Sequence, residues 1–63
     1  MEPSIGRIVH FTANNGEIYP AIIIHVWSST CVNLEVFGQA PDKYPTSVVQ
    51  GDSMYQWNWP PRV

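Results

Sequence analysis

The sequence predicts an all-β protein, either a small, strongly bent antiparallel sheet or an SH3-like barrel of four to five strands. Its apolar segments are short, and glycine, proline and asparagine residues separate them at hairpin spacing. No segment of helical length repeats its apolar residues with the 3.6-residue period of an amphipathic helix. With 63 residues and no internal repeat or linker, we expect residues 1–63 to form one domain.

The longest apolar run, residues 19–27, predicts the strand with which the other strands pair. Its three consecutive isoleucines, followed by valine and tryptophan, give the β-branched and aromatic composition of a strand. Alternation along a strand divides these side chains into two faces. One face carries Ile22, Ile24 and Val26, and the other carries Ala21, Ile23, His25 and Trp27. Only His25 is polar, so we expect both faces to be covered, by barrel closure, by the C-terminal tail or by another subunit.

Four further segments have the composition of strands: residues 5–11, 31–37, 46–50 and 54–59. Asn15-Gly16, between the first two strands, is a strong hairpin signal because both residues tolerate positive φ. Residues 28–30 are predicted to be a tight connection. The loop at 38–45 contains glycine and proline and leads to the fourth strand. The first three strands are therefore expected to form a meander.

So small a domain needs a source of stability beyond its core. A chain of this length buries only about 60% of its unfolded surface, and small folds commonly add disulfides, a structural metal or oligomerisation. The single cysteine, Cys31, excludes an intramolecular disulfide. The histidines, Cys31 and the carboxylates show no metal-ligand spacing, so no metal site is predicted. Homo-oligomerisation is the remaining remedy, and we expect the chain to bind copies of itself.

The charge balance argues against binding to long nucleic acids. The formal net charge is −2, and the only certain cations are Arg7, Lys43 and Arg62. Duplex DNA or RNA binding draws most of its affinity from several lysines and arginines that neutralise phosphates. A small nucleotide needs only one or two cations and an aromatic platform. No secretory leader or membrane-length apolar run is visible, so we expect a soluble protein in a reducing cytoplasm.

No arrangement of residues in the sequence predicts catalysis. The chain contains no nucleophile motif, no phosphate-binding glycine loop and no metal spacing, so we predict a protein that is not an enzyme and has no cofactor. A dyad of Cys31 with His10 or His25 is conceivable, because the first three strands are neighbours. Spacing alone gives no activation geometry for it. The simpler interpretation is a structural cysteine and two hydrogen-bonded histidines.

Aromatic residues are dense in this sequence, with three tryptophans, three tyrosines and two phenylalanines. Alternation in the last strand places Tyr55, Trp57 and Trp59 on one face, and Trp27 ends the central strand. Tryptophan rings stack on bases, with roughly 1–3 kcal/mol per contact in nucleic-acid systems. They also anchor subunit interfaces. The four rings are candidate ligand-stacking residues, and filling a small core or an interface is the competing interpretation.

Polar side chains on adjacent strands complete the candidate site. His10, His25 and Asn33 each lie on the less clearly core-facing side of one of the first three strands, where a polar group needs a hydrogen-bond partner. Asn33 can read a base edge, and Arg7 or Arg62 can bind a phosphate. The predicted functional form is a shallow pocket, both polar and aromatic, on the sheet face.

The order of four motifs resembles a set of short phage and prophage proteins. The motifs are Gly6–Phe11, Pro20–Ile24, Cys31–Phe37 and Trp57–Pro60, in a pattern G-R/K-x-V-H-F/Y, A-I/A-I/V, V-x-L-x-V-F and W-x-W-P. This set is similar to the phage anti-CBASS sponge proteins, small oligomers that sequester the cyclic nucleotide signals of bacterial anti-phage defence without cleaving them. The resemblance implies a multimer with nucleotide pockets between subunits, and it identifies no ligand contacts.

Three functions are therefore under consideration. The first is a phage counter-defence protein that sequesters a cyclic di- or trinucleotide. The second is an SH3-like module for protein interaction or virion assembly, whose aromatic surface contacts a host or phage protein. The third, a small nuclease or phosphodiesterase, requires a base, nucleophile or metal site that the sequence does not show.

Overall fold

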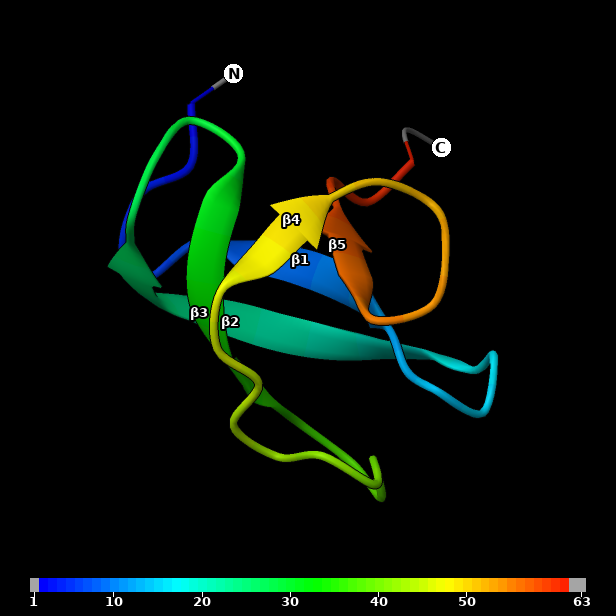
Figure 1. The fold of residues 1–63 in the computed structure, drawn as a ribbon. Helices are drawn as coiled ribbons and strands as arrows, with labels where there is room; N and C mark the ends of the chain where they lie inside the picture. Colours follow the sequence, from blue (N-terminus) through cyan, green and yellow to red (C-terminus); the bar gives the residue numbers. More distant parts are fainter. Residues whose placement is uncertain (1, 62–63) are drawn as a thin grey trace.

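The protein forms a closed barrel of five strands in the computed structural model, which describes residues 2–61 (Figure 1). The strands are β1 (Ile8–Thr12), β2 (Ile18–Val26), β3 (Cys31–Val36), β4 (Val48–Gln50) and β5 (Gln56–Asn58). The prediction of an all-β, SH3-like barrel is confirmed. The described part of the chain contains no helix that is long and apolar enough to cross a membrane.

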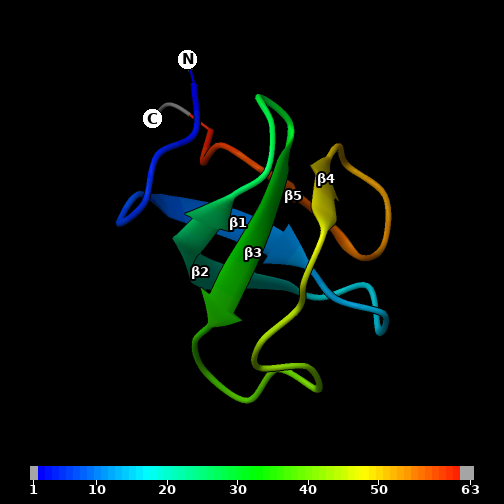
Figure 2. The same cartoon turned by 60° about the vertical axis from the view of Figure 1, so that its left-hand side comes forward.

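The sheet is a meander that closes through its last strand. Strands β1 to β4 pair in sequence order, each antiparallel to the next. Strand β5 pairs antiparallel with β1 and parallel with β4, and so joins the two ends of the meander (Figure 1, Figure 2). The parallel pair was not expected from the sequence. It arises because residues 51–55 carry the chain back towards the start of β4, so that β5 then runs in the same direction as β4.

The inward side chains form an apolar core. Its buried members are Val9, Phe11, Ala13, Ala21, Ile23, Val32, Leu34, Val36, Ala40, Val48 and Trp57. Trp57 is the largest of them and is completely buried. Its indole Nε1–H donates to the carbonyl oxygen of Thr30 at 3.0 Å, so the one polar atom of its ring is satisfied. Strand β5, which closes the barrel, therefore contributes the largest side chain of the core.

A β-bulge in β2 changes the predicted faces of the central strand. Ile23 is opposite Leu34 and His25 is opposite Asn33, so Ile24 is an extra residue without a partner. Beyond the bulge the alternation inverts. Val26 packs against the core, while His25 and Trp27 lie exposed on the outside. The prediction that His25 and Trp27 share a face with Ala21 and Ile23 is therefore wrong, because one inserted residue shifts the alternation.

The first and last strands are shorter than predicted. β1 begins at Ile8 because the chain turns before it, with Gly6 at φ +92° and the Arg7 N–H donating to the Ser4 carbonyl oxygen at 3.2 Å. β5 begins at Gln56 because Tyr55 has φ +61°, outside the strand region. The hairpin at Asn15-Gly16 is confirmed, although only Gly16 takes a positive φ, of +83°.

Barrel closure covers one face of β2 and leaves the other largely open. Ala21 and Ile23 are buried inside, whereas Ile18 is 62% exposed and Ile24 is 44% exposed. Covering of both faces was expected, and among the described residues nothing buries the outer one. The total accessible surface, 4028 Å², is nevertheless close to the roughly 4,100 Å² expected for a folded monomer of 7.1 kDa.

Replacing Trp57 tests the central role of its side chain. We expect Trp57→Ala to lower the free energy of unfolding by about 3–5 kcal/mol, because it leaves a large cavity in the core and removes the indole hydrogen bond to the Thr30 carbonyl. A domain of this size has a total stability of roughly 3–9 kcal/mol, so the milder Trp57→Phe should be compared beside it. Urea denaturation followed by circular dichroism measures both.

Trp27→Ala is the matched control, since Trp27 is 61% exposed. Its unfolding free energy should fall by no more than about 1 kcal/mol. A Trp57→Ala protein as stable as the wild type would contradict this account of the core.

Candidate functional site

The predicted site residues divide into three groups in the folded chain. His10 and Trp59 line a surface cleft at the β1–β5 edge, and Arg7 lies over the Trp59 ring; we call this group and the cleft the Trp59 site. A second group, the Trp27 cluster, consists of His25, Trp27 and Asn33. Tyr55 and Trp57 belong to the core and its margin. Arg62 lies outside the described residues.

The two histidines are too far apart to act on one small ligand. His10 is opposite Pro20 in the β1–β2 pair, and His25 lies five positions farther along β2. At about 3.3 Å per residue, that separation is roughly 15 Å. His25 instead contacts Trp27 in an edge-to-face arrangement, with ring centroids 4.4 Å apart. The single pocket predicted from both histidines is therefore two separate surfaces.

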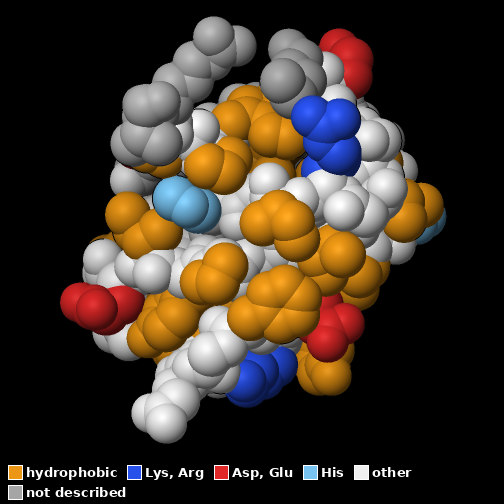
Figure 3. Space-filling model, turned by 180° about the vertical axis from the view of Figure 1, so that it is seen from behind, with side chains coloured by type: hydrophobic (Ala, Val, Ile, Leu, Met, Phe, Trp, Pro, Cys, Tyr) orange, Lys and Arg blue, Asp and Glu red, His pale blue; other side chains and the backbone are white. Residues whose placement is uncertain are grey.

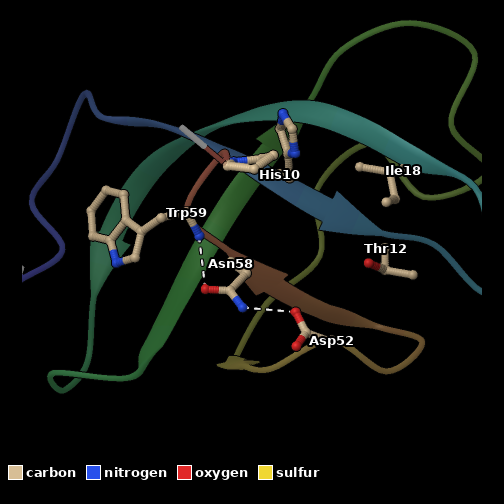
Figure 4. Close-up of a pocket in the computed structure, with 7 residues that line it drawn as sticks. His10, Thr12, Ile18, Asp52, Asn58 and Trp59 are labelled. Atoms are coloured by element: carbon tan, nitrogen blue, oxygen red, sulfur yellow. Dashed lines mark hydrogen bonds between the residues drawn. The ribbon is translucent and has the colours of Figure 1, made fainter. Parts of the chain in front are cut away.

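The Trp59 site includes an open cleft of about 330 Å³ (Figure 4). It is lined by His10, Thr12, Ile18, Asp52, Asn58, Trp59 and Pro61. His10 and Thr12 point outward from β1 because Val9 and Phe11 take the inward positions. Asn58 points outward from β5 for the same reason, since Trp57 is inward. The cleft thus combines an imidazole, a hydroxyl, an amide and a carboxylate with three apolar side chains, those of Ile18, Trp59 and Pro61.

The Asn58 amide holds the polar wall of this cleft in place. Its Nδ2 donates to Asp52 Oδ1 at 2.8 Å (Figure 4). Its Oδ1 accepts from Gln50 Nε2 at 3.1 Å and from the Trp59 backbone N–H at 2.9 Å. With three hydrogen bonds, the amide is oriented before any ligand arrives. Asn58 therefore positions the exposed Asp52 carboxylate, which offers its oxygens to hydrogen-bond donors.

An aromatic ring and a cation lie on the other side of Asn58. Figure 4 shows the Trp59 ring projecting away from Asp52. The Arg7 guanidinium carbon is 5.6 Å from the centroid of that ring, within the range of a cation–π contact. Trp59 is also held from the inside, because the Trp57 ring meets it nearly perpendicular, at 82° and 5.3 Å between centroids. Trp59 is half-buried, so part of its ring stays accessible.

The negative charge of Asp52 and the positive charge of Arg7 make the two sides of the site suitable for different ligand groups. Two like charges 4 Å apart repel each other by about 4 kcal/mol at the effective dielectric constant near a protein surface. An anionic group is therefore unfavourable beside Asp52 and favourable beside Arg7. Neutral donors such as hydroxyl and amino groups are suited to the Asp52 side. A ligand with an anionic end and a hydroxyl-bearing end would match this polarity.

In the Trp27 cluster, the indole ring of Trp27 is exposed but is held by a hydrogen bond. Trp27 is 61% exposed, yet its indole Nε1–H donates to Asn33 Oδ1 at 2.9 Å. The same oxygen accepts the Ser47 backbone N–H at 2.8 Å. Ser47 has φ +54°, an uncommon conformation for a residue with a side chain. Asn33 was predicted to read a base edge, but its acceptor oxygen already receives these two internal hydrogen bonds.

The ligand-stacking prediction is wrong for Trp57, whose ring is completely buried. The competing interpretation, that it fills the core, is the observed one. Tyr55 is partly buried and packs edge-to-face against Phe11, with centroids 5.4 Å apart. Its hydroxyl donates to Asp42 Oδ2 at 3.2 Å, which ties the β3–β4 loop to the barrel. Tyr55 therefore has a structural role in this conformation.

Asp52, Thr12 and Asn58 in the cleft were not predicted from the sequence. Alternation between the two tryptophans of the W-N-W motif is the signal that could have placed Asn58 on the outside. Asp52 lies in a turn, and its approach to Asn58 depends on the path of residues 51–55. No local pattern encodes that path.

Within residues 2–61, no group of three or more histidine, cysteine or acidic side chains is placed to hold a metal ion. Cys31 is a free thiol, half-buried, and it lies opposite Val49 in the β3–β4 pair. His25 lies opposite Asn33 and His10 is on β1.

A scan of the chain against protein-family models finds no matching family, and searches of curated proteins and of solved structures find no significant match.

The Tyr55–Asp42 contact predicts a measurable titration. Burial raises the pKa of the Tyr55 hydroxyl, and the hydrogen bond to Asp42 and the charge of that carboxylate raise it further. Since the folded pKa exceeds the unfolded value of about 10, the stabilisation is complete below that pH. It is lost as the pH rises from about 10 through the folded pKa. Absorbance at 295 nm should show the Tyr55 transition above the unfolded value of about 10.

Asp42→Asn removes the charge and leaves burial in place. We expect this variant to lower the pKa of Tyr55 relative to the wild type, because the hydrogen bond to the carboxylate and its charge both raise that pKa. Identical titration curves for the two proteins would show that Asp42 does not act on Tyr55.

Proposed function

We propose that this protein is a non-catalytic binding protein that sequesters a small cyclic oligonucleotide, as the phage sponge proteins do. One observation carries the proposal: a cation, an accessible tryptophan ring and a cleft edged with hydrogen-bonding groups adjoin one another at the Trp59 site. These three features complement the three parts of a nucleotide. The cation suits the phosphate, the aromatic ring suits the base, and the hydrogen-bonding groups suit the ribose. Arg7 directly precedes β1 and Trp59 directly follows β5, and the cleft residues come from β1, β2, β5 and the segments that flank β5.

Each half of the site suits one part of such a ligand. A base stacks on the accessible part of the Trp59 ring, with roughly 1–3 kcal/mol from the contact. A phosphate lies beside the Arg7 guanidinium, where charge attraction favours it. The ribose 2′-hydroxyl of a 3′,5′-linked nucleotide donates to Asp52, as ribose hydroxyls commonly do to carboxylates. His10 and Thr12 supply further polar contacts from β1.

The site is also consistent with capture of an intact ligand. Asn58, the most extensively hydrogen-bonded group in the cleft, is an amide and neither gains nor loses protons at ordinary pH. We propose that the site binds its ligand without a bond-breaking step. Under this proposal the ligand is released unchanged when the protein unfolds.

Ligand-induced stabilisation tests the proposal. Cyclic di- and trinucleotides should each be added to the purified protein during thermal unfolding. A ligand at a hundredfold excess over its dissociation constant should stabilise the fold by about 2.7 kcal/mol. Mass spectrometry should then recover the added nucleotide intact. Trp59→Ala should weaken binding about tenfold or more, in line with the loss of one stacked base.

Trp27→Ala is the matched control, since it removes an exposed tryptophan from the other surface. It should leave nucleotide binding unchanged. The absence of stabilisation by any cyclic nucleotide would contradict the proposed function. Equal loss of binding in the two variants would contradict the assignment to the Trp59 site.

A second candidate function, an SH3-like protein-interaction or virion-assembly module, is favoured by the Trp27 cluster. An exposed tryptophan whose indole N–H is already bonded to Asn33 is held in one orientation before binding. Fixed aromatic side chains make strong interface anchors because little rotamer entropy is lost on association. This function predicts the converse result: no response to nucleotides, and binding of a polypeptide that Trp27→Ala abolishes and Trp59→Ala leaves intact.

A further inference from the structure

A carboxylate without a partner lies on the outer face of β3, beside the Trp27 cluster. Leu34 and Val36 point into the core, so Glu35 between them points outward, as Asn33 does. Within residues 2–61, the half-buried Glu35 carboxylate makes no hydrogen bond or ion pair. A charged group that is partly removed from water is stabilised by a charge of opposite sign. This position therefore favours a cation.

Two exposed aromatic side chains flank this carboxylate. Trp27 is hydrogen-bonded to Asn33, the next outward residue along β3, which is roughly 7 Å from Glu35. On the other side, Tyr44 lies directly opposite Glu35, because backbone bonds of 3.0 and 2.7 Å on either side of this pair join β3 to residues 43–45. The Tyr44 side chain is 64% exposed. We call the Trp27 cluster together with Glu35 and Tyr44 the Glu35 surface.

The cations of the described chain are engaged elsewhere. The Lys43 ammonium donates to the carbonyl oxygen of Gly38, and the Arg7 guanidinium lies over the Trp59 ring. A cation from a partner can therefore reach Glu35 without displacing an ion pair of this chain. Seen from behind, the molecule carries many hydrophobic side chains and only a few, scattered charged ones (Figure 3). On a surface of this kind, a single carboxylate can decide which charged partner is favoured.

We propose that the Glu35 surface binds an arginine side chain on an extended segment of another protein. A guanidinium group can donate two hydrogen bonds to the Glu35 carboxylate while its flat face packs on an aromatic ring. The indole N–H of Trp27 is already bonded to Asn33, so its exposed ring offers a face and not a donor. Lysine lacks the planar group that serves both contacts. The net charge of −2 also favours the approach of a basic segment.

This inference rests on the second candidate function, for which it names the chemistry of the partner, and it does not depend on nucleotide binding. The Glu35 surface shares no residue with the Trp59 site. A protein that binds cyclic nucleotides but no arginine peptide would contradict this inference alone. A protein that binds the arginine peptide but no nucleotide would contradict the proposed nucleotide binding alone.

An NMR titration with a synthetic peptide tests the proposal. The probe is a blocked peptide of alternating arginine and glycine, and its control is the same peptide with citrulline, which lacks the positive charge, in place of arginine. Peptide at up to about 2 mM detects dissociation constants near 1 mM. The arginine peptide should shift the Trp27 indole N–H signal and the Asn33 side-chain amide signals. The citrulline peptide should leave them unchanged.

Glu35→Gln should raise the dissociation constant of the arginine peptide at least about tenfold, because it removes the carboxylate that the guanidinium pairs with. Since Glu35 has no internal partner, the barrel should remain folded by circular dichroism. Glu17→Gln is the matched control. It makes the same change in net charge at an exposed position in the turn before β2. Its dissociation constant should stay within about twofold of the wild type, because salt screens distant charges.

Three results would overturn the proposal. The first is the absence of any shift in the wild type with the arginine peptide. The second is an effect of Glu17→Gln as large as that of Glu35→Gln, which would show that only the net charge of the protein matters. The third is equal or tighter binding of the citrulline peptide or of the corresponding lysine peptide, which would contradict recognition of a guanidinium group.

Discussion

The barrel depends on the burial of Trp57 against the opposite side of the sheet. Its ring is the largest buried side chain of the core, and its indole N–H donates to the Thr30 carbonyl in the β2–β3 turn. This bond joins residues 27 positions apart in the sequence. Strand β5 has only three residues, too few to hold by backbone pairing alone. We infer that burial of Trp57 adds the stability that backbone pairing of so short a strand lacks, and so keeps the barrel closed.

The surfaces follow from this closure. With Trp57 inward, Asn58 must point outward on β5, and Trp59, one position farther, packs its ring against the Trp57 ring. The Trp59 site is thus placed by the residue that closes the core. The Trp27 cluster has a different origin, since the bulge at Ile24 turns His25 and Trp27 outward. The two surfaces share no residue, which is why separate variants can test ligand binding and protein binding.

Much of the fold could be predicted because most of the strands obey strict alternation. In β3 the buried residues are Val32, Leu34 and Val36, as the sequence pattern indicates. The bulge could not be predicted, since Ile24 is as apolar as its neighbours and an extra residue leaves no compositional signal. The site was predicted only in part. Arg7 does contact Trp59, and His10 lines the same cleft as Trp59, but Asp52 reaches the cleft through a turn whose path no local pattern encodes.

Hydrogen exchange of the indole N–H groups tests the central role of Trp57 most directly. NMR can follow the three tryptophan Nε1–H signals separately in native protein placed in D₂O. If the barrel closes around Trp57, its N–H should exchange only through global unfolding and should be the slowest of the three, with Trp27 far faster. A Trp57 signal that exchanges as fast as that of Trp27 would contradict the account, because it would show that the last strand opens without unfolding the rest.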